Sequence, residues 1–270
     1  RVITCFSLLL IVIFVTAACT LQAPRVNSSE QPQREYSYQI PEKVTDGWEV
    51  SSLKEEGIDT VRINELMSNI LLGNFPKIHS VLLVKNGKLV LEEYFYDYNR
   101  ERLHQIRSAT KSIGSVLTGI AIDQGFIKNE NERIYQHFKS YEPKEGWDER
   151  VRDVTLKSLM TMTSGYDCDD HKGNFNCERN MYKSDDWLEY ALNLPMVYNP
   201  GDHWAYNSAS LWLVGEVISK ESHMSIPDFA DKYLFEPLAI TNFQWGFSPK
   251  GRAWLAGNAE MRPRDMAKFG

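Results

Sequence analysis

The chain has 270 residues, of which 43% are hydrophobic, 24% are charged and 12% are aromatic. This composition is that of a folded globular protein and argues against disorder, and the length allows one sizeable domain or two small ones. The net charge is −6 and no basic run interrupts it. The chain therefore lacks the electrostatic basis for binding nucleic acid.

The N-terminal segment has the pattern of an export signal. An apolar run from Phe6 to Val15 is too short to span a bilayer as a helix but suits the core of a signal peptide. Small residues then precede Cys19, as in a lipobox, where the cysteine is acylated. We predict a lipoprotein-type signal peptide over residues 1–18, a lipid on Cys19 that attaches the protein to a membrane, and a location in the cell envelope. A plain cleaved signal is the alternative, and it also implies export.

The next segment, residues 19–50, is rich in Pro, Gln, Ser and charged residues and shows little periodicity. These features are typical of a tether between an anchor and a folded domain. We therefore expect the folded domain to occupy residues 51–270.

The first elements of that domain are a helix and a hairpin. Apolar residues at helical spacing predict an amphipathic helix over 58–72. Two β-rich runs follow, 80–84 and 89–96, and Asn86-Gly87 between them supplies the positive φ angles of a tight type I′ turn.

The remaining elements are mostly helical. Periodicity and end signals predict helices over 108–125, 154–162, 187–194, 208–219 and 226–235, a polar loop over 166–186, and a helix start near Pro263. The chain thus has an α+β pattern, an antiparallel sheet flanked by helices plus a helical subdomain. Because a hairpin alone makes a poor sheet, we expect strands beyond Gly270 to complete it.

Two cysteines lie close together in the predicted polar loop. Export makes a disulfide between Cys168 and Cys177 chemically permissible. The intervening Asp169, Asp170 and His171 invite a metal site, but this spacing is not a known zinc pattern. We favour a disulfide that closes the loop and predict no metal.

The strongest chemical signal is a Ser-x-x-Lys pattern at Ser108 and Lys111. Serine needs a base to become a nucleophile. If Ser108 opens a helix, a lysine three positions later lies on the same face, within reach of its hydroxyl. The same pattern occurs at Ser51 and Lys54, but without a long apolar helix after it. The plainer interpretation of Ser108 is an N-cap serine.

A second signal is Tyr206, which follows the Pro200-Gly201 turn and directly precedes an apolar helix. A tyrosine phenol can exchange protons when cations are close, and Ser208 can help to hold a neighbouring lysine. Tyr182-Lys183-Ser184 fits the same loose pattern. The plainer interpretation of Tyr206 is an aromatic side chain packed on the core.

In this order, Ser-x-x-Lys and Tyr-x-Ser resemble the motifs of the serine β-lactamase and penicillin-binding-protein-like superfamily. Residues 156–165, which end in Thr-Ser-Gly, resemble its Leu-Leu-x-x-Thr-Ser-Gly segment, and Pro200-Gly201 and residues 235–238 resemble further landmarks. The resemblance runs from about Val81 to Gly270. It favours the class C and carboxylesterase-like branch, because the second motif contains tyrosine.

The resemblance implies roles for individual residues. Ser108 would be acylated, Lys111 and Tyr206 would share proton transfer, and Ser208 would orient Lys111 and border the substrate. The Ser108 N–H would be one oxyanion donor. One departure is clear, since no Lys/His-Thr/Ser-Gly motif follows Tyr206, so the activity of this stretch alone is in question.

The expected function is therefore that of a serine hydrolase acting through an acyl-enzyme on a small ester, amide or short peptide, with no cofactor. A D-Ala-D-Ala-type peptidase and a β-lactamase are the alternatives within this chemistry. An alternative of another class is a non-catalytic binding lipoprotein of the cell envelope, since a fold does not fix function.

Overall fold

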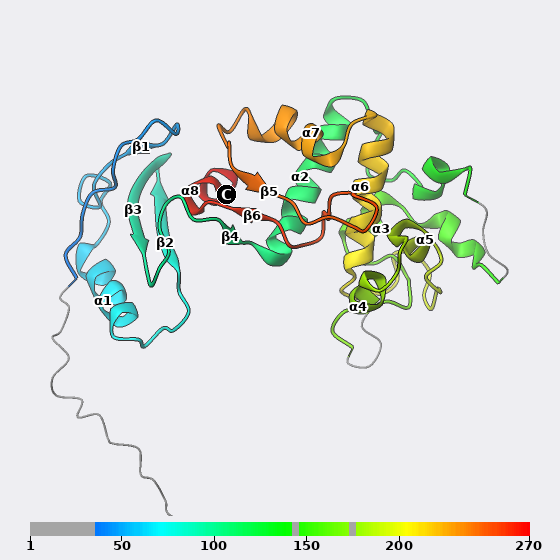
Figure 1. The fold of residues 1–270 in the computed structure, drawn as a ribbon, viewed down its shortest axis with the longest axis horizontal. Helices are drawn as coiled ribbons and strands as arrows, with labels where there is room; N and C mark the ends of the chain where they lie inside the picture. Colours follow the sequence, from blue (N-terminus) through cyan, green and yellow to red (C-terminus); the bar gives the residue numbers. More distant parts are fainter. Residues whose placement is uncertain (1–35, 142–145, 173–176) are drawn as a thin grey trace, which may run out of the picture.

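A computed structural model of the chain describes residues 36–141, 146–172 and 177–270. A first small sheet and one helix lie at one end of the molecule, most helices lie at the other, and α8 and a second small sheet lie between them (Figure 1). This is the predicted α+β architecture. The predicted signal peptide and Cys19 lie outside the described residues.

The helices and strands have the following bounds. The strands are β1 (Glu49–Val50), β2 (Ser80–Lys85), β3 (Lys88–Tyr94), β4 (His104–Gln105), β5 (Phe243–Gln244) and β6 (Glu260–Met261). The α-helices are α1 (Thr60–Leu71), α2 (Thr110–Asp123), α3 (Leu156–Met160), α4 (Cys177–Tyr182), α5 (Trp187–Leu192), α6 (Ser208–Ser222), α7 (Ile226–Ala230) and α8 (Pro263–Phe269). Short 3₁₀ segments are η1 (Arg107–Ala109), η2 (Ile134–Phe138) and η3 (Glu149–Asp153), and a π-helical turn, η4 (Asp231–Phe235), follows α7.

The first sheet has the strand order β1-β3-β2. The predicted hairpin forms as β2 and β3, and both Asn86 and Gly87 have positive φ, 51° and 74°. Helix α1 begins after Asp59, whose carboxylate accepts the Val61 N–H, and its buried Met67 packs with apolar residues of β3. The sheet is not purely antiparallel, because β1 pairs with β3 in parallel.

The end of the expected tether belongs to the folded domain. The Tyr36 hydroxyl donates to Glu93 at 2.6 Å and the Tyr38 hydroxyl donates to the Val90 carbonyl at 2.9 Å, both on β3. Strand β1 also lies within this stretch. The prediction of a tether to residue 50 was therefore wrong for residues 36–50. The hydroxyls of Tyr36 and Tyr38 form hydrogen bonds with β3, at residues 57 and 52 positions further along the chain.

A buried ion pair links β3 and the 36–50 segment to α8. The Arg264 guanidinium donates to Glu92 Oε1 at 2.7 Å and to Asp46 Oδ2 at 2.9 Å, and the side chains of Arg264 and Glu92 are both 3% exposed. Such a pair is costly to break, since removing one partner leaves a buried charge unmatched. The contact joins residues that are 172 positions apart in the sequence.

The second sheet brings two distant segments together. Its strand order is β4-β6-β5, and His104 and Gln105 pair with Met261 and Glu260. Sequence periodicity could not predict these strands, because two residues are too short to show a pattern.

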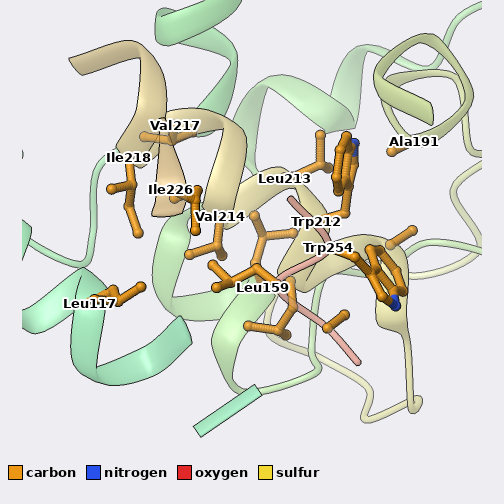
Figure 2. Close-up of a cluster of buried hydrophobic side chains, with 14 of the residues drawn as sticks. Leu117, Leu159, Ala191, Trp212, Leu213, Val214, Val217, Ile218, Ile226 and Trp254 are labelled. Atoms are coloured by element: carbon orange, nitrogen blue, oxygen red, sulfur yellow. The ribbon is translucent and has the colours of Figure 1, made fainter. Parts of the chain in front are cut away.

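Helix α6 is the centre of the helical region. Twelve of its fifteen residues are buried, which marks a helix surrounded by other elements rather than an amphipathic surface helix. Figure 2 shows Val214, Val217 and Ile218 of α6 among apolar side chains from α2, α3 and α7.

Leu255 packs between α2 and α6 where both helices carry glycine. A Cβ added to Gly114 would lie 3.0 Å from the Leu255 side chain, and one added to Gly215 would lie 3.3 Å from it. Leu255 is fully buried. The segment that carries Leu255 is therefore fixed against both helices.

Most helices start and end near the predicted positions, and one was missed. Helix α4 lies inside the stretch that was predicted as a polar loop. Among the described helices, none combines the length and the apolar character that crossing a bilayer requires.

Glu216 is the buried acid of α6. Its side chain is 4% exposed, it pairs with Arg252, and it borders a cavity of about 610 Å³. Burial raises the pKa of Glu216 from 4.5 to about 7, while the Arg252 charge opposes that rise.

We predict that Glu216→Gln changes how stability depends on pH. Between pH 4.5 and about 7, the folded protein holds a proton on Glu216 that the unfolded chain releases, so the free energy of unfolding falls as pH rises. Across this window, the free energy of unfolding of the wild type should fall by up to about 3 kcal/mol more than that of the variant. Urea unfolding at a series of pH values measures this, and parallel curves for the two proteins would contradict it.

Candidate active site

Ser108 lies in a tight turn at the start of α2. Arg107, directly before it, has a positive φ of 49°, and the Thr110 hydroxyl donates to the Arg107 carbonyl at 2.6 Å. The Ile106 N–H donates to the Ala259 carbonyl at 2.9 Å, which fixes the turn to the strand segment before β6. Left-handed backbone at a non-glycine residue is a strained conformation that often occurs at functional sites.

The Ser108 side chain is exposed and does not cap α2. The N-cap residue of α2 is Ala109, which makes no side-chain cap bond. The plainer interpretation of Ser108 as an N-cap serine is therefore wrong. Its hydroxyl instead accepts a hydrogen bond from Lys111 Nζ at 3.3 Å.

Lys111 is held by a second acceptor, the Ala256 carbonyl. Ala256 follows Leu255, whose packing between α2 and α6 sets the position of this carbonyl. The ammonium group is thus fixed between the turn of Ser108 and the 254–258 segment. No sequence pattern identifies Ala256, because its contact with Lys111 is made by the backbone carbonyl.

Tyr206 completes the group. Lys111 Nζ lies 4.9 Å from the centroid of the Tyr206 ring, a distance at which a cation and an aromatic ring attract each other. Residues predicted from two separate motifs, 95 positions apart at Lys111 and Tyr206, therefore lie side by side. Ser108, Lys111 and Tyr206 form one cluster.

The loop before Tyr206 is held by the 162–165 segment. The Met162 carbonyl accepts the Ala205 N–H at 2.9 Å, and the Thr163 carbonyl accepts the Gly201 N–H at 2.7 Å. Gly165 has a φ of 84°, and a Cβ there would lie 2.5 Å from the Tyr198 carbonyl oxygen. The Thr-Ser-Gly sequence thus serves the site by positioning the Tyr206 loop.

Ser208 does not have the contact that was predicted. It is the first residue of α6, 1% exposed, and its N–H donates to Asp170 Oδ2 at 2.7 Å. In the described part of the chain, the acceptors of Lys111 are Ser108 and Ala256. Ser208 therefore does not hold Lys111 in this structure.

The predicted disulfide between Cys168 and Cys177 is present, with the two Cα atoms 5.3 Å apart. Cys168, Asp170 and Cys177 come close enough to form a possible metal-ligand group. The two sulfurs are bonded to each other, however, and the Asp170 carboxylate accepts two backbone N–H groups. The group as built is a structural link.

The two competing motif matches are engaged elsewhere. The Ser51 hydroxyl donates to Glu55 at 3.1 Å in a turn outside any helix, and the Tyr182 hydroxyl donates to Glu178 at 3.0 Å. In the described residues, neither side chain is hydrogen-bonded to a lysine, whereas Ser108 and Tyr206 both contact Lys111.

Comparison with known proteins gives a match to one family model and a similarity to a curated protein. A family model described as Beta-lactamase matches residues 79–270. The lovastatin esterase of Penicillium rubens is 27% identical over 129 residues, which cover 46% of this chain and 32% of the esterase.

Solved structures share the fold. A proposed 6-aminohexanoate-dimer hydrolase from Bacillus anthracis has a TM-score of 0.64 at 18% identity, with 74% of this chain and 55% of that chain covered. An octameric penicillin-binding protein homologue from Pyrococcus abyssi has a TM-score of 0.60 at 17% identity, with 78% and 55% covered. The chain thus spans about a third of the esterase and about half of each of these structures.

We predict that Gly165→Ala destabilises the protein by about 2 to 4 kcal/mol, because it combines backbone strain with a clash. Gly201→Ala is the matched control, since Gly201 also has a positive φ, 99°, but a Cβ there has open space. Thermal and urea unfolding compare the two variants. Equal losses would show that the contact with Tyr198 does not constrain the loop.

Proposed function

We propose that this chain, which belongs to the Beta-lactamase family, carries the acylation machinery of a serine hydrolase that acts on an ester or an amide. The observation that carries the proposal is the position of Lys111 Nζ. It is bonded to the Ser108 hydroxyl and lies against the Tyr206 ring. Serine hydrolases require such a proton acceptor next to the nucleophile.

The chemistry would proceed in two stages. Ser108 Oγ attacks the carbonyl carbon of the substrate, and its proton passes to the pair formed by Lys111 and Tyr206. The pair returns the proton to the leaving alcohol or amine as the carbonyl–heteroatom bond breaks. Water then attacks the acyl carbon and gives a proton to the same pair, which passes that proton to Ser108 Oγ as the bond between Oγ and the acyl carbon breaks.

The Ser108 N–H is suited to stabilise the developing oxyanion, since it lies where the η1–α2 segment starts. This donor comes from the turn that also places the nucleophile. A change in the backbone of Arg107 would therefore disturb both functions at once.

The substrate class is best supported as a small ester or amide. Relatives of this chain include a protein named as an esterase and one named as a dimer hydrolase. A D-Ala-D-Ala-type peptidase and a β-lactamase would use the same acyl-enzyme, and reactivity with penicillin distinguishes them. A non-catalytic binding lipoprotein would leave Ser108 unreactive.

We also propose that the protein is exported and anchored through a lipid on Cys19. The N-terminal sequence supports export, and so does the Cys168–Cys177 disulfide, since disulfides persist in oxidising compartments.

We predict that a fluorophosphonate adds once to the full-length protein, at Ser108. Ser108→Ala should abolish the adduct, and Tyr206→Phe should slow ester turnover by about 10²- to 10⁴-fold because it removes proton transfer. Intact mass and a chromogenic ester assay measure the two effects.

Ser51→Ala is the matched control, because Ser51 lies in the other Ser-x-x-Lys pattern but bonds to Glu55. It should keep the adduct in full. A folded wild-type protein that takes up neither fluorophosphonate nor penicillin would refute the hydrolase and leave the binding lipoprotein.

For the anchor, we predict that Cys19→Ser abolishes incorporation of radiolabelled palmitate and releases the protein from the membrane fraction. Retention of label in the variant would refute lipidation at this cysteine.

A further inference from the structure

Asp170 contacts the chain directly after the Tyr206 side chain. Its N–H donates to the Tyr206 carbonyl at 2.8 Å, and its Oδ2 accepts the Ser208 N–H at 2.7 Å. A single residue therefore holds the two peptide groups that follow the Tyr206 Cα, and with them the backbone that carries the Tyr206 ring. The bond to Ser208 also satisfies one of the first N–H groups of α6, which have no partner within the helix.

The same carboxylate is tied to the disulfide. Asp170 Oδ1 accepts the Glu178 N–H at 2.9 Å, and Glu178 directly follows Cys177. Cys168 lies two residues before Asp170, and the bond between the two cysteines closes this short loop. The disulfide thus holds both segments that position the carboxylate.

His171, next in the chain, lies against the Tyr206 ring. The ring centroids are 4.8 Å apart and the planes differ by 35°. Tyr206 therefore has the Lys111 ammonium and the His171 imidazole as close neighbours of its ring. A segment that holds the backbone of Tyr206 also packs on its side chain.

We propose that Asp170, held in place by the Cys168–Cys177 disulfide, is a positioning residue that sets Tyr206 against Lys111. The proposal rests on the proposed function. A displacement of about 1 Å at a reacting group can cost a factor of about 100 in rate. Loss of Asp170 or of the disulfide should therefore slow turnover without removing the nucleophile.

The test uses Asp170→Asn in the full-length protein, with Asp169→Asn as the matched control. An asparagine keeps the size but replaces one acceptor oxygen with a donor group, so one backbone N–H loses its partner. Asp169 accepts the neighbouring His171 N–H and pairs with Lys172, and it makes no bond to Tyr206 or Ser208 in the described residues. Circular dichroism confirms that each variant is folded at the assay temperature.

We expect Asp170→Asn to lower kcat for a chromogenic ester by about 10- to 100-fold, with KM changed by no more than roughly twofold, and Asp169→Asn to leave both unchanged. Adding Asp170→Asn to Tyr206→Phe should cost little more than Tyr206→Phe alone, because no phenol remains to be positioned. A folded Asp170→Asn variant with wild-type kcat would overturn the proposal. Rate losses that multiply in the double variant would also overturn it.

Reduction gives an independent measurement. Dithiothreitol converts the disulfide to two thiols and is itself oxidised to a cyclic disulfide. The wild type should then lose kcat in the same proportion as Asp170→Asn, whereas a Cys168→Ser/Cys177→Ser variant should not respond. An unchanged kcat in the reduced, folded wild type would overturn the role of the disulfide. A wild type without any acylation would instead refute the proposed function, so the two failures are distinguishable.

Discussion

The packing of Leu255 between the glycines of α2 and α6 is the constraint on which the site depends. Helix α2 follows the turn of Ser108, and α6 begins two residues after Tyr206. Because Gly114 and Gly215 leave room for the Leu255 side chain, the next carbonyl, that of Ala256, reaches Lys111. The packing of one apolar side chain thereby sets the relative positions of Ser108, Lys111 and Tyr206. Interiors are packed too closely for such a contact to shift alone.

The sequence predicted those elements whose signals lie within the element itself, such as turns and helices. Asn86-Gly87 dictates its hairpin through two positive φ angles, and the helices follow from apolar spacing. Ser108, Lys111 and Tyr206 were identified because their motifs stand next to long apolar helices, whereas Ser51 and Tyr182 lack that setting. Context along the chain was enough to choose among motif matches.

What could not be predicted depends on partners far away in the sequence. Residues 36–50 read as a tether because nothing nearby shows that Tyr36 and Tyr38 bond to β3. Ser208 was expected to hold Lys111, but the Ala256 carbonyl accepts the lysine's hydrogen bond instead, and no sequence motif identifies a backbone carbonyl. Asp170 was seen only as a possible ligand, since its bonds to Tyr206 and Ser208 arise from the closed loop.

The pairing of β4 with β6 has a consequence for how the protein is made. Residues 104 and 105 meet residues 260 and 261, and Arg264 meets Glu92. During synthesis the later partners emerge roughly 10 to 30 seconds after the earlier ones. Contacts so distant in sequence also form slowly. The hydrogen bonds from Ile106 to the Ala259 carbonyl and from Lys111 to the Ala256 carbonyl therefore cannot form until residues 256–259 have been synthesised. Until then, Ser108 lacks the contacts that position it.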